Sequence, residues 1–162
     1  MLSLSKFYRS TLGASEQKFI CLADEINIIK TYLSIEKERF GGRLEYEITV
    51  NGNADDVSIS GLLLQPIVEN SIKHGISSLP AGGKIAVHCT ISEKEVHIVV
   101  RDTGVGFGFS KKTGGTSHGL SNVQERLRLL FGDKASLKCT NENGAKVEIR
   151  FPNIRAPQVL NQ

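Results

Sequence analysis

The sequence of 162 residues has no tryptophan, one methionine and only three cysteines. Cys21, Cys89 and Cys139 are scattered, and neither a disulfide framework nor a zinc-binding spacing is formed from them, which favours a reducing compartment. No apolar run approaches the roughly 18 residues that span a bilayer, and the first residues do not form a signal peptide. The net charge of +3 comes without a basic block, so nothing argues for nucleic acid as a partner.

What is present is an ordinary globular composition, with 40% hydrophobic and 23% charged residues and no internal repeat. A chain of this length suits one domain around a single core. Apolar periodicity predicts three helices, and alternation predicts five strands. The helices are expected at 22–40, 61–74 (regular from about Pro66) and 119–131, and the strands at 44–50, 85–91, 96–102, 135–140 and 145–151.

The strands arrive largely as hairpins, which predicts an α+β fold, a two-layer sandwich of a mixed sheet with helices on one face. The same hairpin content disfavours a doubly wound parallel sheet.

The first informative motif is Glu69-Asn70-Ser71-Ile72-Lys73-His74-Gly75. On a helix, residues four apart share a face, so Glu69 is expected beside Lys73 and Asn70 beside His74. Val68 and Ile72 then point to the opposite side. A purely structural interpretation also holds, since a solvated face is common and two bases near a helix C-terminus complement its dipole without a ligand.

The second motif is Asp102-Thr103-Gly104-Val105-Gly106-Phe107. Asp102 continues the apolar face of its strand, where an unpaired carboxylate is costly and a partner with donors, such as the amino group of a base, removes the penalty. Gly104 and Gly106 permit positive φ and close backbone approach. The structural alternative is a turn capped by the aspartate.

A third stretch, Gly114-Gly115-Thr116-Ser117-His118-Gly119-Leu120, leads a glycine-rich loop into a helix N-terminus, whose free N–H groups favour phosphate. This stretch alone is a weak signal. The three pieces together, in this order, indicate a nucleotide, which offers a polyanion with a bound cation at one end and a flat base at the other.

The chain resembles the catalytic and ATP-binding domain of sensor histidine kinases, in the GHKL superfamily that shares the Bergerat fold. Residues 64–75 are similar to the N box of that family, 102–107 to its first glycine box and 115–120 to its second. The segments 22–40 and 119–132 resemble the LytS-like branch. The resulting division is an N-terminal segment or linker at 1–20, a linker helix at 21–42, the ATP-binding domain at 43–155 and a tail at 156–162.

The resemblance implies ATP and Mg²⁺ as cofactors, with Asn70 as the metal ligand through its side-chain oxygen. It implies that Glu69 polarises the attacking nucleophile and that Lys73 and His74 contact phosphate. For the base, it implies that Asp102 accepts from the adenine amino group and that Gly104, Gly106 and Phe107 line the pocket.

The resemblance further implies that residues 107–118 form an ATP lid. The second glycine box would contact the nucleotide through Gly115, Thr116, Ser117, His118, Gly119 and Leu120, with the last two as hinge into the third helix. The implied partners are a phosphoacceptor and dimerisation helix, a response regulator and a second copy in the full-length protein. The implied location is the cytoplasmic side of a membrane-anchored bacterial sensor.

Two departures from the family pattern keep alternatives open. Ser117 stands where the second box usually has its first glycine, and residues 1–30 contain no histidine to accept a phosphoryl group. The chain is therefore expected to be a fragment, or to act on a histidine elsewhere. The alternatives are a GHKL ATPase or serine-kinase relative, or a module that holds nucleotide without turnover; a metal-dependent hydrolase is poorly supported, because no cluster has ligand spacing.

Overall fold

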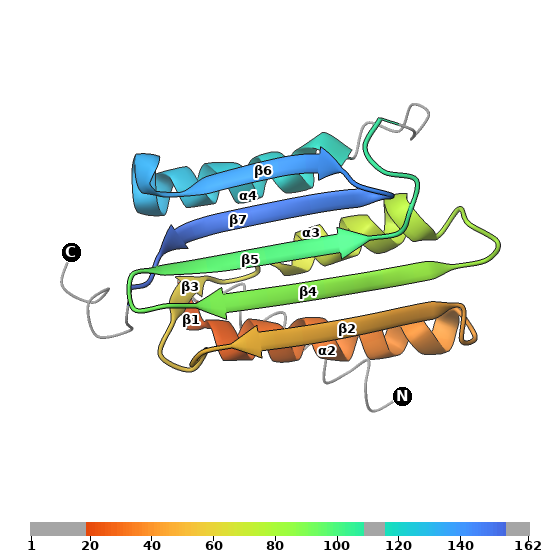
Figure 1. Ribbon diagram of the computed structural model, residues 1–162, viewed down its shortest axis with the longest axis horizontal. Helices are drawn as coiled ribbons and strands as arrows, with labels where there is room; N and C mark the ends of the chain where they lie inside the picture. The colour runs from red at the N-terminus through yellow and green to blue at the C-terminus, as the bar shows by residue number, and fades with distance from the viewer. Residues whose placement is uncertain (1–18, 109–115, 155–162) are drawn as a thin grey trace.

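The computed structural model describes residues 19–108 and 116–154 (Figure 1). The helical elements are α2 (Leu22–Arg39), α3 (Gln65–Asn70), the π-helical turn η1 (Ser71–Ile76), α4 (Thr116–Phe131) and the short 3-10 turn η2 (Gly132–Lys134). The strands are β1 (Phe19–Cys21), β2 (Leu44–Asn51), β3 (Ser58–Ser60), β4 (Gly83–Ile91), β5 (Glu95–Asp102), β6 (Ser136–Asn141) and β7 (Ala145–Pro152). No helix in these two ranges has a stretch long and apolar enough to cross a bilayer.

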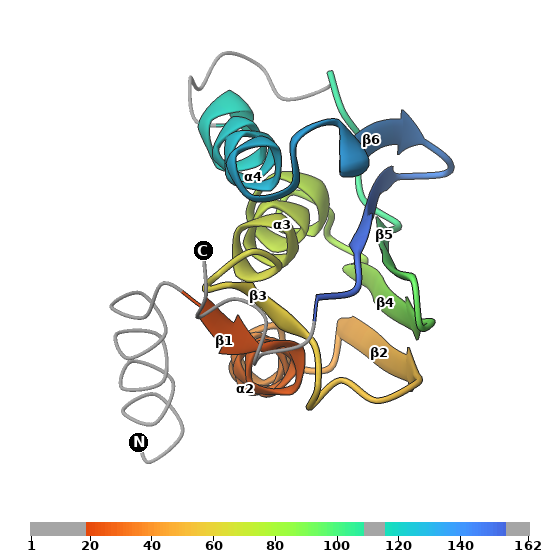
Figure 2. The same ribbon diagram turned by 90° about the vertical axis from the view of Figure 1, so that its left-hand side faces the viewer.

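Five strands form one mixed sheet in the order β2-β4-β5-β7-β6. β2 runs parallel to β4, and each of the other neighbouring pairs is antiparallel. Helices α2, α3 and α4 all cover the same face of this sheet (Figure 2). The predicted α+β sandwich with helices on one face is therefore confirmed.

The core lies between the helices and the covered face of the sheet. Alternation along the strands delivers its sheet side, since Val87 and Cys89 of β4 and Ile98 and Val100 of β5 are buried. The helices bury the residues of one stripe each. On the helices these residues are Ile29, Leu33, Ile67, Val68, Ile72, Val123 and Leu127.

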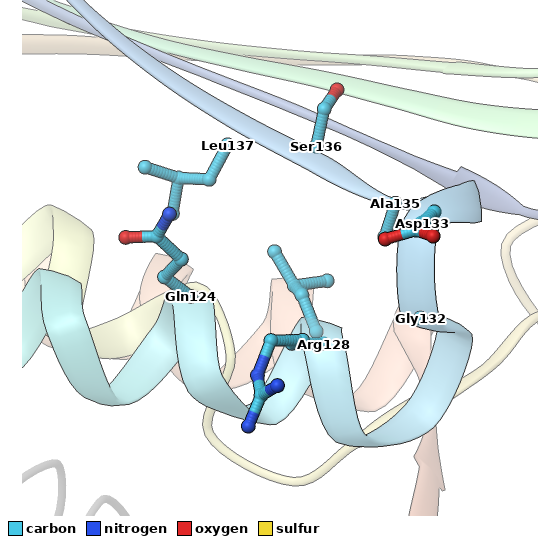
Figure 3. Close-up of a pocket in the computed structure, with 8 residues that line it drawn as sticks. Gln124, Arg128, Gly132, Asp133, Ala135, Ser136 and Leu137 are labelled. Carbon is cyan, nitrogen blue, oxygen red and sulfur yellow. The ribbon is translucent and has the colours of Figure 1, made fainter.

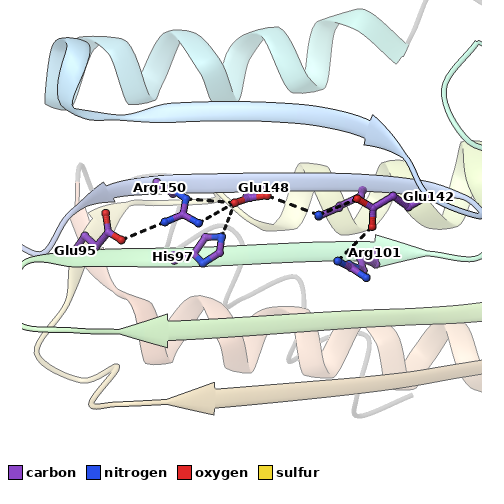
Figure 4. A network of polar contacts seen from close by, with 7 residues as sticks. Glu95, His97, Arg101, Glu142, Glu148 and Arg150 are labelled. Atoms are coloured by element: carbon purple, nitrogen blue, oxygen red, sulfur yellow. Dashed lines mark hydrogen bonds and ion pairs between the residues drawn. The ribbon is translucent and has the colours of Figure 1, made fainter.

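The other face of the sheet carries ion pairs between β5 and β7, which Figure 4 shows as a row of polar side chains. Glu148 accepts from Arg150 at 3.0 Å and lies 2.8 Å from the ring of His97. Arg150 also reaches Glu95 at 3.2 Å. This open face carries mostly polar side chains, which accounts for the alternation of outward polar and inward apolar residues along β5 and β7.

Three local features differ from the sequence-based expectation. β1 and β3 pair with each other in a second, two-stranded sheet, although neither was predicted. The helix of the first motif continues to Ile76 as a π-helical turn rather than ending near His74. Helix α4 begins at Thr116, three residues before the predicted start at Gly119.

A buried carboxylate joins α2 to the start of α3. Glu25 is fully buried, and its Oε1 accepts hydrogen bonds from the backbone N–H groups of Leu64 and, at 3.2 Å, of Gln65. Oε2 has no partner in the described part of the chain. Burial raises the pKa of the Glu25 carboxyl to about 8, against the lowering effects of these amides and of Arg126.

This carboxyl makes stability depend on pH. Because its pKa is raised on folding, the folded state keeps a proton that the unfolded state loses above about pH 4.5, and the stabilisation is lost as the pH rises through about 8. Urea unfolding is expected to show a free energy of unfolding higher at pH 5 than at pH 8.5, with Glu25 supplying on the order of 2–4 kcal/mol of the difference.

Glu25→Gln removes the titrating group while keeping an acceptor for the two amides, so it should flatten this pH dependence. Glu36→Gln is the matched control, because Glu36 is a buried acid of the same helix that pairs with Arg39 instead of α3. Equal pH dependence in the wild-type chain and in Glu25→Gln would contradict the assignment.

Candidate functional site

The two sequence motifs meet backbone to backbone. A Cβ added at Gly104 would lie 2.5 Å from the Cα of Gly75, and Val105 N–H donates to the Gly75 carbonyl at 3.1 Å. Gly75 sits in the π-helical turn that ends the first motif, while Gly104 follows the end of β5. A side chain at Gly104 would collide with the Gly75 backbone, and a Cβ at Gly75 would lie 3.0 Å from Asp102 Oδ1, a tight contact. The glycines therefore let the helix of the first motif approach the C-terminal end of β5 closely.

Asp102 is buried at the end of β5, with 4% of its surface exposed, as its place on the apolar face predicted. Its Oδ1 accepts from the N–H groups of Gly104 at 2.9 Å and of Ala145 at 3.1 Å. Both hydrogen bonds that described residues give this carboxylate end on Oδ1, and Oδ2 accepts none from them. Two backbone amides thus already satisfy one oxygen, and the bond from Gly104 is the aspartate-capped turn that the sequence left open as the structural alternative.

The turn after Gly104 is fixed by a residue outside the three sequence motifs. Asn141, at the end of β6, accepts from Phe107 N–H at 2.8 Å and donates to the Phe107 carbonyl at 3.1 Å. Gly106 adopts the left-handed φ of +74° between them. The predicted positive φ is therefore confirmed for Gly106. At Gly104 a glycine is required because the backbone lies close to that of Gly75. No local sequence signal pairs Asn141 with Phe107, since the two are 34 residues apart.

Glu69 is held by two neighbours one helical turn away on either side. Gln65 donates through Nε2 to Glu69 Oε1 at 2.8 Å, and Lys73 donates through Nζ to Oε2 at 3.0 Å. The predicted pairing of Glu69 with Lys73 on one face is confirmed. The Glu69 side chain remains 28% exposed, so its carboxylate is oriented by the protein yet open to a reactant.

Asn70 lies where the first motif faces the start of α4. Its Nδ2 is buried without a partner among the described residues, 3.0 Å from where a Cβ of Gly119 would stand. A buried Nδ2 that no described residue bonds fits a role of this amide as metal ligand, since a half-turn of the side chain exchanges oxygen and nitrogen. The described residues contain no cluster of three His, Cys, Asp or Glu, and Mg²⁺ held by one side chain with phosphate oxygens does not require one.

The remaining predicted residues are placed to different extents. His74 lies half-buried in the π-helical turn, and Leu120 packs at the edge of the core in the second turn of α4. Thr116, Ser117 and His118 form the first residues of α4. Gly115 and most of the predicted lid, residues 109–115, lie outside the described residues. Gly119 is inside α4, so the predicted hinge position belongs to the helix rather than to the loop before it.

A cavity of about 360 Å³ lies elsewhere, between the second half of α4 and the start of β6 (Figure 3). Its lining includes Gln124, Arg128, Asp133 and Ser136. None of the residues predicted for the nucleotide belongs to it. The converging polar groups of the two motifs, and not this cavity, therefore form the candidate site.

Comparison with known proteins identifies the family and the fold. Residues 55–155 match the family described as histidine kinase-, DNA gyrase B- and HSP90-like ATPases, and residues 1–44 match a histidine kinase family. The chain belongs to the first of these families. It has the fold of the catalytic domain of histidine kinase ThkA, with a TM-score of 0.63 at 19% identity over 85% of this chain and 99% of that one.

Two sensor histidine kinases are related in sequence. BtsS of Escherichia coli K12 is 34% identical over 151 residues, which is 92% of this chain and 26% of BtsS. The sensor histidine kinase/phosphatase LytS of Staphylococcus aureus Mu50 is 35% identical over 150 residues, covering 85% of this chain and 26% of LytS. The chain thus spans about a quarter of the length of these relatives.

The contact between the two motifs is testable by adding one methyl group. Gly104→Ala forces a Cβ into the backbone of Gly75, which has no flexible side chain to give way, so we expect a loss of roughly 2–4 kcal/mol in urea unfolding. Gly41→Ala is the control, because Gly41 has a φ of +59° and no described atom within 4 Å of its added Cβ. Its cost should stay near the ~1 kcal/mol of a left-handed residue. A smaller loss for Gly104→Ala than for Gly41→Ala would contradict the contact.

Proposed function

We propose that this chain is the ATP-binding catalytic domain of a sensor histidine kinase, which binds Mg-ATP and transfers the γ-phosphoryl group to a histidine outside residues 1–162. The observation that carries the proposal is the junction at Gly75 and Gly104. It sets a buried carboxylate, whose Oδ2 accepts no hydrogen bond from a described residue, beside the helix of Glu69 and Asn70. A nucleotide has the matching chemistry at its two ends.

The adenine end would lie at Asp102. Because two amides hold Oδ1, the free Oδ2 presents a fixed acceptor to the exocyclic amino group of adenine. Gly104, Gly106 and Phe107 would line the base pocket, with Phe107 held by Asn141. Guanine has a carbonyl where adenine has the amino group, so the same acceptor would oppose it.

The phosphate end would lie where α3 and η1 face α4. Asn70 would hold Mg²⁺, which when bound neutralises charge on the phosphate oxygens. Lys73 and His74 would contact phosphate, and the exposed Lys73–Glu69 pair is weak enough to be exchanged for it. The second glycine box would add contacts from Gly115, Thr116, Ser117, His118, Gly119 and Leu120.

Glu69 would act on the nucleophile. Its carboxylate is oriented by Gln65 and Lys73 and remains partly exposed, as a group that polarises an incoming imidazole must be. The proposed partners are therefore a phosphoacceptor and dimerisation helix, a second copy of the full-length protein and a response regulator, with the domain on the cytoplasmic side of a membrane-anchored sensor. Ser117 favours one second candidate, a module that holds ATP without turnover.

Nucleotide preference tests the adenine end. ATP and ADP should bind more tightly than GTP in titration calorimetry by about tenfold or more, which corresponds to about 1.4 kcal/mol. In Asp102→Asn the two amides keep the side-chain oxygen on their side, so an NH₂ group replaces Oδ2. This change should weaken ATP and reduce or reverse the preference over GTP. Equal affinity of the wild-type chain for ATP and GTP would sink the assignment.

Phosphoryl transfer tests the other end. The chain alone should bind ATP without forming phosphohistidine, and adding a phosphoacceptor helix should restore labelling from radioactive ATP. Asn70→Ala should abolish the tightening of ATP binding by Mg²⁺. Glu69→Ala should keep ATP affinity while slowing transfer roughly 100-fold or more.

Glu125→Ala is the control for Glu69→Ala, since Glu125 is an acid in an exposed helical ion pair with Arg128. It should transfer at the normal rate. A normal rate in Glu69→Ala would show that its proposed role is wrong, and ATP binding without any transfer to a supplied histidine helix would favour the module without turnover.

A further inference from the structure

Two helices hydrogen-bond to the turn that starts α3, one through an acceptor and the other through a donor. From α2, Glu25 takes the N–H groups of Leu64 and Gln65. From α4, Arg126 Nη1 donates to the carbonyl of Gly61 at 2.9 Å and to that of Leu62 at 3.4 Å. The N–H groups of this turn thus face a buried acceptor and its carbonyls a charged donor, which fixes where α3 begins.

The backbone of the turn is also held in an unusual conformation. Leu62 has a φ of +59°, which costs a residue with a side chain about 1–2 kcal/mol and persists only where the surroundings impose it. Leu64, the residue before the helix, makes no capping bond with its own side chain. Glu25 supplies that cap from 39 positions away, so the start of α3 depends on the position of α2.

Gln65 carries this constraint one turn further along the helix. Its backbone N–H is bonded to Glu25, and its side chain donates to Glu69 Oε1 at 2.8 Å. Gln65 is 6% exposed, and its own Oε1 is buried without a partner in the described part of the chain. A buried amide with an unpaired carbonyl is costly, and an apolar side chain of the same length would avoid that cost. The amide, unlike such an apolar side chain, can make the hydrogen bond to Glu69.

The two contacts of Glu69 are not equivalent. The Lys73 ammonium is 59% exposed, so its pairing is screened by solvent and free to exchange. The Gln65 side chain is buried, and the backbone of the same residue is bonded to Glu25. The orientation of the Glu69 carboxylate is therefore set mainly by Gln65.

We propose that Gln65 is a positioning residue for Glu69 and that Glu25 anchors Gln65. The position of α2 on the domain then sets the orientation of the Glu69 carboxylate. This inference rests on the proposed function of Glu69 in phosphoryl transfer. It assigns to the helix before the ATP site a direct, three-residue connection to the reacting group: α2 through Glu25, then Gln65, then Glu69.

The test uses the full-length kinase and separates kcat from KM for ATP. Gln65→Met keeps the length of the side chain and removes the hydrogen bond, so kcat for phosphoryl transfer should fall about 10–100-fold while KM and the Kd for ATP change less than about threefold. Ile67→Val, a buried change on the same helix, is the control and should leave kcat within about twofold. Unchanged kcat in Gln65→Met would overturn the proposal.

Two variants of Glu25 test whether this residue anchors Gln65. Glu25→Gln keeps an acceptor for the two amides and should retain kcat within about threefold, whereas Glu25→Met removes the acceptor and should lower kcat as Gln65→Met does. Equal rates in the two Glu25 variants would overturn the anchor. These variants carry the test if Gln65→Met does not fold.

A double-mutant cycle ties the effect to Glu69. In the Glu69→Ala background, Gln65→Met should slow transfer no further, because the group that it positions is gone. An equal further loss there would mean that Gln65 acts on something else. Slow transfer in Glu69→Ala with normal transfer in Gln65→Met would refute the positioning alone, whereas normal transfer in Glu69→Ala would refute the proposed function of Glu69 and the positioning with it.

Discussion

The contact between the backbones of Gly75 and Gly104 sets the geometry on which the rest of the site depends. It places the end of the first motif's helix against the turn after β5, with the Val105 N–H bonded to the Gly75 carbonyl. Gly144, in the β6–β7 hairpin, also packs closely at this contact, since a Cβ added there would collide with the Asp102 carbonyl. Three segments far apart in the chain thus meet at one point because none carries a side chain there.

Both ends of the helix of the first motif are associated with a buried acid that backbone amides satisfy. Glu25 takes two N–H groups at the start of α3, and Asp102 takes two beside the end of η1. The second oxygen of each acid lies in a different environment. Glu25 is sealed in the core with its second oxygen unpaired, and burial raises its pKa. Asp102 Oδ2 accepts no hydrogen bond from a described residue, which is why we propose it, and not Glu25, as the acceptor for a base.

The long elements of the fold were predictable because their buried faces repeat. Alternation in β4 and β5 and the stripe of Val68 and Ile72 are local patterns, and the hairpin joining the two strands follows from their spacing. β1 and β3 were missed because three residues each are too few for a period, and their pairing joins segments 39 positions apart. The π-helical turn was missed because an extra residue in a turn has no simple sequence signature.

At the candidate site, the sequence predicted the burial of single residues better than the contacts between them. Asp102 was expected in the core and is found there, but its backbone donors include Ala145, 43 positions away. Glu25 looked like an ordinary acid of the first turn of a helix, where the dipole favours it, and nothing local marks it as the cap of another helix. Such partners follow only from how the helices pack on the sheet.

The most direct test of the account is a crystal structure of the chain with Mg²⁺ and a non-hydrolysable ATP analogue. The account predicts the adenine amino group within hydrogen-bonding distance of Asp102 Oδ2, with the Gly104 and Ala145 amides still on Oδ1, and the cation on Asn70. Adenine bound away from Asp102, for example in the cavity between α4 and β6, would contradict it.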